Sequence, residues 1–135
     1  MATSYLRVQL PVGGGLAFPT YDIKGYDAWS IRGVFFTTFN GGAAAIATPR
    51  LEVQTSIGLT IFSVSSTDVG IGLTGFDMFA PGMSQTAVVT AASRQQTIPF
   101  PDLWFKEDAR LQCGFTGGDA TTLITFATMW LAFNK

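Results

Sequence analysis

Three carboxylates in the last third of the sequence are the side chains with the best spacing for acid–base chemistry. Asp102, Glu107 and Asp108 lie close together along the chain, and two carboxyl groups with different pKa values can serve as general acid and general base. Glu107 and Asp108 stand between Lys106 and Arg110, however, as polar residues do at the tip of a hairpin. We therefore interpret them as a solvated turn and not as a catalytic dyad.

Other catalytic and cofactor chemistry lacks its usual residues. The sequence contains no histidine, so the commonest general base, the commonest metal ligand and the Ser/His and Cys/His pairs are all missing. The glycines of Gly13–Gly15 and Gly70–Gly75 do not continue into a phosphate-binding loop, and no Asp-x-Asp-x-Asp calcium pattern is present. We expect no catalytic residue, no metal and no cofactor, and we predict that the protein is not an enzyme.

Cys113 is the single cysteine, so no disulfide can form within the chain. It lies in an alternating run that places it on one face with Leu111 and Phe115. This pattern predicts a buried free thiol and not a reactive one.

The composition argues against several classes of partner. Only 13% of residues are charged and 47% are apolar, whereas about 25% charged residues are typical of soluble proteins. The net charge is −1 with no basic stripe, which argues against nucleic acid and against a membrane surface as partners. Residues 1–7 lack a signal-peptide pattern, so we expect the chain to stay in the cytoplasm or in a particle assembled there.

Short alternating or β-branched runs separated by Gly and Pro turns dominate the sequence. We expect one domain over residues 1–135, an all-β antiparallel sandwich or jelly roll of about eight or nine short strands. The expected strands cover residues 5–10, 28–39, 44–48, 51–61, 69–76, 86–92, 103–105, 110–116 and 121–133. Residues 51–61 alternate most regularly, and this pattern predicts one strand with Leu59 buried in its middle and Gln54 on the opposite face.

Two of these expected strands are apolar on both faces. In 121–133 strict alternation places Leu123, Ala127 and Met129 opposite Ile124, Phe126 and Trp130. In 28–39 it places Trp29, Ile31, Phe35 and Phe39 opposite Val34 and Phe36. A sandwich covers only one face of each sheet, so the second apolar face indicates a covering loop or a subunit neighbour. We assign this second face to self-association, with Val34, Phe36, Ile124, Phe126 and Trp130 as the candidate interface residues.

The last third of the chain also resembles a known class of protein. A proline-led segment, IPFPDLWFKEDARLQCGF from Ile98, precedes a Gly-Asp turn at Gly118–Asp119 and a long final strand ending near Phe133. This arrangement resembles small virion structural proteins of tailed bacteriophages. The resemblance implies a β-sandwich or jelly-roll decoration or adaptor protein that forms oligomers on the particle.

These observations lead to one main functional hypothesis and two alternatives. The main hypothesis is a non-enzymatic capsid decoration or cement protein, located in the virion after assembly in the host cytoplasm, whose partners are copies of itself, as a homo-oligomer and most simply a trimer, and the major capsid protein. A tail or head–tail adaptor role is the alternative within the same class. In the other alternative the chain is a carbohydrate-binding β-sandwich in which Trp104, Trp29 or Tyr26 stacks on sugar rings.

Overall fold

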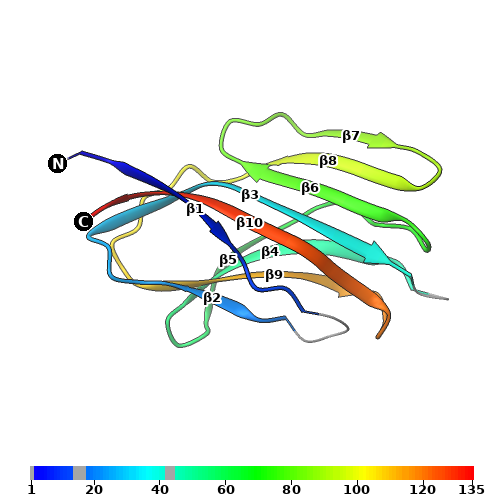
Figure 1. The fold of residues 1–135 in the computed structure, drawn as a ribbon, viewed down its shortest axis with the longest axis horizontal. Coiled ribbons are helices and arrows are strands. Elements are labelled where there is room, and N and C mark those ends of the chain that lie inside the picture. The colour runs from blue at the N-terminus through cyan, green and yellow to red at the C-terminus, as the bar shows by residue number, and fades with distance from the viewer. Residues whose placement is uncertain (1, 14–17, 42–44) are drawn as a thin grey trace.

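The computed structural model describes residues 2–13, 18–41 and 45–135 and arranges them in two packed sheets (Figure 1). The strands are β1 (Ser4–Gln9), β2 (Thr20–Ile23), β3 (Ala28–Asn40), β4 (Ala47–Thr55), β5 (Thr60–Ser65), β6 (Thr74–Ala80), β7 (Thr86–Val89), β8 (Ser93–Pro99), β9 (Ala109–Gly117) and β10 (Thr122–Asn134). Residues 14, 15 and 44, which belong to an expected turn and an expected strand, lie outside the described ranges. Since the described residues form no helix, none that is long and apolar enough to cross a membrane occurs among them.

The strand order identifies the architecture as a jelly roll. The larger sheet has the order β1-β10-β3-β6-β8-β7, and the smaller sheet has the order β2-β9-β4-β5. Without β7 and β8, the chain forms two four-stranded antiparallel sheets that exchange strands across the sandwich, which is the eight-stranded jelly-roll arrangement. The predicted all-β sandwich of jelly-roll type is therefore confirmed.

The strands β7 and β8 extend the larger sheet beyond this framework. They form an antiparallel pair, and β8 lies parallel to β6 with Thr74–Ala80 opposite Ser93–Pro99. Among the described residues the smaller sheet has no strands that correspond to this pair, so the two layers differ in width.

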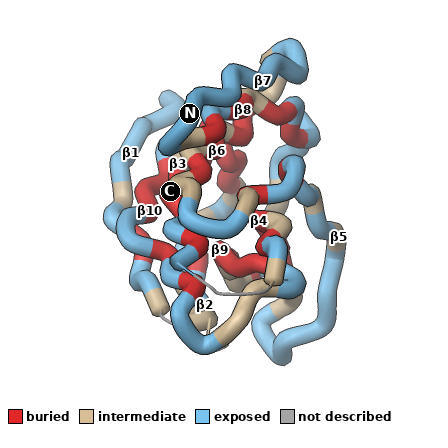
Figure 2. Tube along the Cα trace, turned by 90° about the vertical axis from the view of Figure 1, so that its right-hand side faces the viewer, coloured by how far each residue is buried: buried red, intermediate tan, exposed pale blue. Residues whose placement is uncertain are grey.

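The hydrophobic core lies between the two sheets (Figure 2). Its largest fully buried side chains include Trp29, Phe36 and Phe79. Trp29 stacks on Phe105 with ring centroids 4.5 Å apart, and Phe36 stacks on Phe79 at 5.6 Å. The buried thiol of Cys113 lies in this cluster with Leu111 and Phe115, as predicted.

Two irregularities between β3 and β10 change which side chains face the core. Thr125 is an extra residue opposite β3, and Arg32 is an extra residue opposite β10, so strict alternation fails at both points. As a result Trp29, Ile31, Val34 and Phe36 all face the core from β3, although Val34 and Phe36 were expected on the other face. Ile124 likewise turns inward, whereas Phe126 remains outside.

The expected continuous strand over residues 51–61 is wrong. The chain turns back at residues 56–59, where the amide of Gly58 donates to the carbonyl oxygen of Thr55 (2.9 Å) and the amide of Thr55 donates to that of Leu59 (2.7 Å). Gly58 has φ +90°, a conformation that a glycine adopts without strain. Leu59 therefore lies at a hairpin tip with 62% of its surface exposed, and it is not a core residue.

Candidate interaction surface

The outward side of the larger sheet carries a continuous stripe of large apolar side chains, which we call the outer face. It runs along β10, β3 and β6, on the side away from the smaller sheet. Its members are Phe35, Phe39, Phe76, Met78, Leu123, Phe126 and Trp130. They are half-buried or exposed in the isolated chain, with 37% of Phe126 and 38% of Trp130 open to solvent.

Cross-strand contacts join these side chains into one surface. The rings of Phe35 and Phe126 lie 6.2 Å apart, and Phe35 is paired across the sheet with Met78. At Gly33 a Cβ atom would lie 3.0 Å from Met78 Cε and 3.3 Å from Trp130 Cε3. Gly33 thus allows the two side chains to approach each other over the backbone of β3, and the stripe has no gap there.

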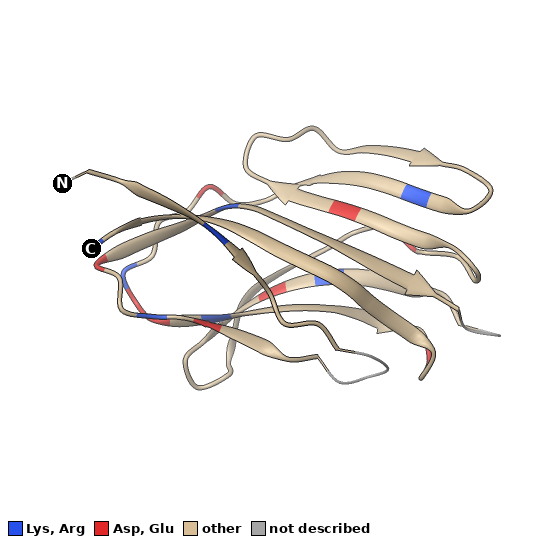
Figure 3. Cartoon of the chain, in the orientation of Figure 1, with Lys and Arg blue, Asp and Glu red and all other residues tan. Residues whose placement is uncertain are grey.

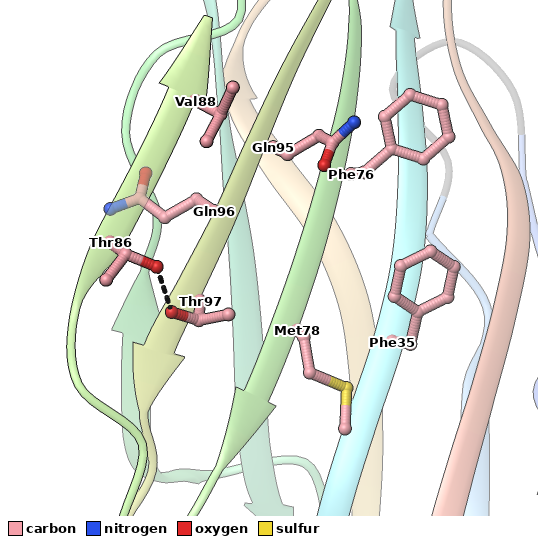
Figure 4. A pocket seen from close by; sticks show the side chains of 8 residues that line it. All are labelled: Phe35, Phe76, Met78, Thr86, Val88, Gln95, Gln96 and Thr97. Carbon is pink, nitrogen blue, oxygen red and sulfur yellow. Dashed lines mark hydrogen bonds between the residues drawn. The ribbon is translucent and has the colours of Figure 1, made fainter.

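A shallow groove continues the outer face toward β7 (Figure 4). It has a volume of about 210 Å³ and is lined by Phe35, Phe76, Met78, Thr86, Val88, Gln95, Gln96 and Thr97. The hydroxyl groups of Thr86 and Thr97 are 2.7 Å apart, and that of Thr97 also donates to the carbonyl oxygen of Ser84 (2.6 Å). The groove therefore combines an apolar floor with an uncharged polar rim.

Charged residues border the outer face but do not enter its centre. Arg7 of β1 lies opposite Trp130, and Arg32 forms an ion pair with Asp102 at 2.7 Å. Many of the other charged residues lie on the β2–β3 and β8–β9 loops, at the end of the sandwich that holds the C-terminus (Figure 3). A protein partner would thus meet an apolar centre with a polar and charged margin, which is the usual composition of an interface.

The candidate interface residues from the sequence separate into two groups. Phe126 and Trp130 lie on the outer face, where they are accessible to a partner. Val34, Phe36 and Ile124 are buried between the sheets and cannot contact another molecule in the folded chain. Their assignment to an exposed face needs correction, and the physical reason is the pair of extra residues between β3 and β10.

Sequence reasoning missed several outer-face residues. Phe35 was placed with Trp29, Phe76 was the last residue of the strand expected over residues 69–76 and was given no outward face, and Met78 lay beyond that strand. The β6 sequence TGFDMFA does alternate, with Phe76 and Met78 on one face and Asp77 and Phe79 on the other. Asp77 made this alternation hard to recognise as that of a strand, because a carboxylate is unusual on a face that points into the core.

The inward Asp77 belongs to a buried polar cluster. Arg94 of β8 donates to both carboxylate oxygens of Asp77, at 2.6 and 3.3 Å, and both side chains are almost completely buried. The hydroxyl of Ser66 also donates to Asp77, and Arg94 donates to the carbonyl oxygen of Thr67 at 2.9 Å. Burial raises the pKa of Asp77, while the hydrogen bonds from Arg94 and Ser66 act in the opposite direction.

The carboxylates first considered for chemistry do not converge. Asp102 bonds Arg32, and Asp108 accepts a hydrogen bond from the amide of Gly25 at 3.4 Å. Glu107 uses its backbone carbonyl, which accepts from Trp29 Nε1 at 2.8 Å. Among the described residues no three His, Cys, Asp or Glu side chains gather as metal ligands would.

The aromatic residues considered for sugar stacking differ in accessibility. Trp29 is buried, and Tyr26 packs on Phe133 with ring centroids 4.6 Å apart. Trp104 remains exposed in the β8–β9 loop. These residues therefore do not form one platform.

No protein-family model and no curated protein matches the chain. One similar solved chain comes from a structure titled "Structure of infectious bursal disease virus Gt strain", with a TM-score of 0.44 and 11% sequence identity. The match covers 99% of the present chain and 31% of the viral one, so the chain spans about a third of that protein's length. The strand order of the chain itself is that of a jelly roll.

Proposed function

We propose that the protein is a non-enzymatic structural component of a virion that packs through its outer face against copies of itself and against the capsid surface. The observation that carries this proposal is the continuous, uncharged stripe of aromatic and apolar side chains on the outward side of a complete sandwich. The sandwich already has a full core between its sheets, so these side chains are not needed to form it.

The energetics favour coverage of this face. Apolar area removed from water contributes about 25 cal/mol per Å², so covering several half-exposed aromatic side chains contributes several kcal/mol per subunit. Phe, Trp and Met are also enriched at the centres of protein interfaces, where charged residues are depleted. This gain has to exceed the entropy lost on association.

Two further features support the virion as the setting. Jelly rolls are common in viral capsid proteins, although a fold alone does not determine function. The resemblance of residues 98–133 to small tailed-phage virion proteins points the same way. Within this setting we propose a decoration or cement protein that forms a closed homo-oligomer, most simply a trimer.

A single charged substitution tests the outer face. We expect sedimentation velocity to show a large oligomer for the wild type and a smaller, folded species for Phe126→Asp, because a buried unpaired charge opposes assembly through the outer face. Ile61→Asp is the matched control, since Ile61 is 45% exposed and lies on the smaller sheet. A monomeric wild type, or an equal effect of the two substitutions, would contradict the proposal.

The composition of purified virions tests whether the protein is located in the virion. Mass spectrometry of gradient-purified virions from the source culture is expected to detect the chain in many copies per particle. Phe126→Asp protein added to particles that lack the chain should bind less than wild type, while Ile61→Asp protein should bind normally. Absence of the chain from purified virions would refute the virion role.

The groove favours a second candidate function, the binding of an uncharged sugar. Phe35, Phe76 and Met78 provide an apolar floor for one face of a pyranose ring, and the Gln95 side chain at the rim is exposed and available for hydrogen bonds. Calorimetric titration with neutral oligosaccharides would then show saturable binding that Gln95→Ala weakens about tenfold. Absence of saturation with every sugar would eliminate this candidate.

A further inference from the structure

The first strand leaves one edge of the larger sheet open. β1 pairs with β10 alone, in an uninterrupted register from Ser4 opposite Phe133 to Gln9 opposite Thr128. No described segment pairs with its other side, so that edge presents backbone groups to solvent. Such an edge accepts another strand unless charges, proline or a bulge prevent it.

The side chains of β1 divide between the two faces of the sheet. Leu6 and Val8 lie opposite Leu131 and Met129, which are buried, and so they point toward the core side. Leu6 is nevertheless 42% exposed. Tyr5 and Arg7 point to the outward side, and Arg7 forms no ion pair with any described residue. The edge therefore exposes an apolar side chain on one face and an aromatic and a cation on the other.

We propose that a second copy of the chain pairs with this edge, β1 against β1 in antiparallel orientation, with Leu6 on the two-fold axis. Side chains of paired residues stay on the same face only if one residue lies on the axis opposite its own copy. With Leu6 there, the two leucines contact each other on the core side. Tyr5 then lies opposite Arg7 of the second copy on the outward side, where a guanidinium packs well on an aromatic ring.

Neighbouring registers are less favourable. An axis at Arg7 places two guanidinium groups opposite each other, and like charges in directly opposed positions are destabilising. An axis at Tyr5 shortens the overlap between the two β1 strands. It also places Leu6 opposite Ser4, so Leu6 gains little apolar contact. The charge and polarity of β1 thus select the register centred on Leu6.

The other open edges are less suited to this pairing. β2 has only four residues, follows Pro19 and contains Asp22, which together discourage strand addition. β7 is also only four residues long. β5 is as long as β1, but Phe62 and Val64 on its core side are already half-buried in the chain's own core cluster.

Cysteine cross-linking tests the register directly. Opposed residues of an antiparallel pair have Cα atoms about 4.5–5.5 Å apart, which a disulfide can span. We expect Leu6→Cys protein to form a covalent dimer under mild oxidation, while Val88→Cys on the β7 edge and the wild type, with its buried Cys113, stay monomeric on a denaturing gel. Equal cross-linking of Leu6→Cys and Val88→Cys would overturn the proposal.

A mixture of two variants tests the same β1–β1 register without a substitution at Leu6. Tyr5 and Arg7 are exposed, so substitution there should leave the fold intact. Tyr5→Cys and Arg7→Cys chains should cross-link when mixed, and neither should do so alone to the same extent. Cross-links that appear only when Leu6→Cys and Val88→Cys chains are mixed would show β1–β7 pairing instead and would refute the two-fold contact.

A charge on the axis provides the solution test. Leu6→Lys places two like charges in contact, and we expect it to weaken the dimer by about tenfold or more. Ile61→Lys, at a residue of similar exposure on β5, should leave dimerisation unchanged.

The β1 contact is separate from the outer face, so the cross-link of Leu6→Cys should persist in the Phe126→Asp background. If chains with Phe126 intact show no assembly through the outer face while Leu6→Cys still cross-links, the result counts against the proposed function alone.

Discussion

The ion pair between Asp77 and Arg94 is the most deeply buried charge in the described part of the chain, and its position explains its role. Asp77 lies on β6 and Arg94 on β8, the two parallel neighbours, and their partners Ser66 and Thr67 belong to the segment after β5. The pair thus joins the extension of the larger sheet to the end of the smaller one. Replacement of a buried ion pair by apolar residues is often neutral for stability, so we infer that this pair serves to select one arrangement of the strands.

Removal of one partner is expected to destabilise the fold strongly. Asp77→Asn leaves the Arg94 charge buried without a counter-ion, and we expect it to lower the free energy of unfolding by about 3–5 kcal/mol. The double variant Asp77→Leu with Arg94→Met removes both charges and should cost much less. Urea denaturation followed by tryptophan fluorescence measures both, and equal losses would show that the charge itself is unimportant.

Whether a residue's environment could be predicted depended on the regularity of its strand. Cys113 was placed correctly because β9 pairs with β4 without any shift of register from Ala109 to Gly117, so period-two alternation holds throughout. Val34, Phe36 and Ile124 were misplaced because the extra residues Arg32 and Thr125 reverse the alternation. Nothing in the local sequence marks either position as a bulge, since the choice depends on the partner strand.

At the scale of elements, the hairpin between β4 and β5 shows how alternation can mislead. Leu51 and Val53 are fully buried, and the same apolar–polar alternation continues through Ile57 and Leu59 although the chain has already reversed. Ser56 and Gly58 are turn residues, but strict alternation assigns them to the polar face of a strand. The hairpin tip therefore carries exposed apolar side chains.

This correction yields a paired stability prediction. Leu51→Ala should lower the free energy of unfolding by about 2–5 kcal/mol, since it opens a cavity in the core. Leu59→Ala should change it by less than about 0.5 kcal/mol, because its side chain is largely in water. Chemical denaturation of the two variants measures this difference, and similar losses would place Leu59 back in the core.

The strands β2 and β8 could not be predicted from the chain's own pattern. β2 is four residues long and contains Asp22, so no apolar period identifies it. β8 reads SRQQTIP, and it faces the interior with Arg94 and Gln96, which are buried only because Asp77, Ser66 and Thr67 supply their hydrogen bonds. Such strands are specified by tertiary partners and not by local propensity.

At the scale of the whole molecule, the two proposed contacts have different symmetry. The edge contact through β1 is a two-fold contact between identical strands. The outer face, if it closes a trimer, supplies a three-fold contact on a different part of the same sheet. Two such contacts in one chain connect copies into an extended or closed assembly, and each can be removed without the other.

The unequal width of the two layers affects how copies could be arranged side by side. Strands in a sheet lie about 4.8 Å apart, so the extra β7–β8 pair makes one layer of the sandwich about 10 Å wider than the other. The sandwich is therefore wedge-shaped in cross-section. Copies packed side by side with both layers in contact would form a curved array, with the narrower layer on the concave side.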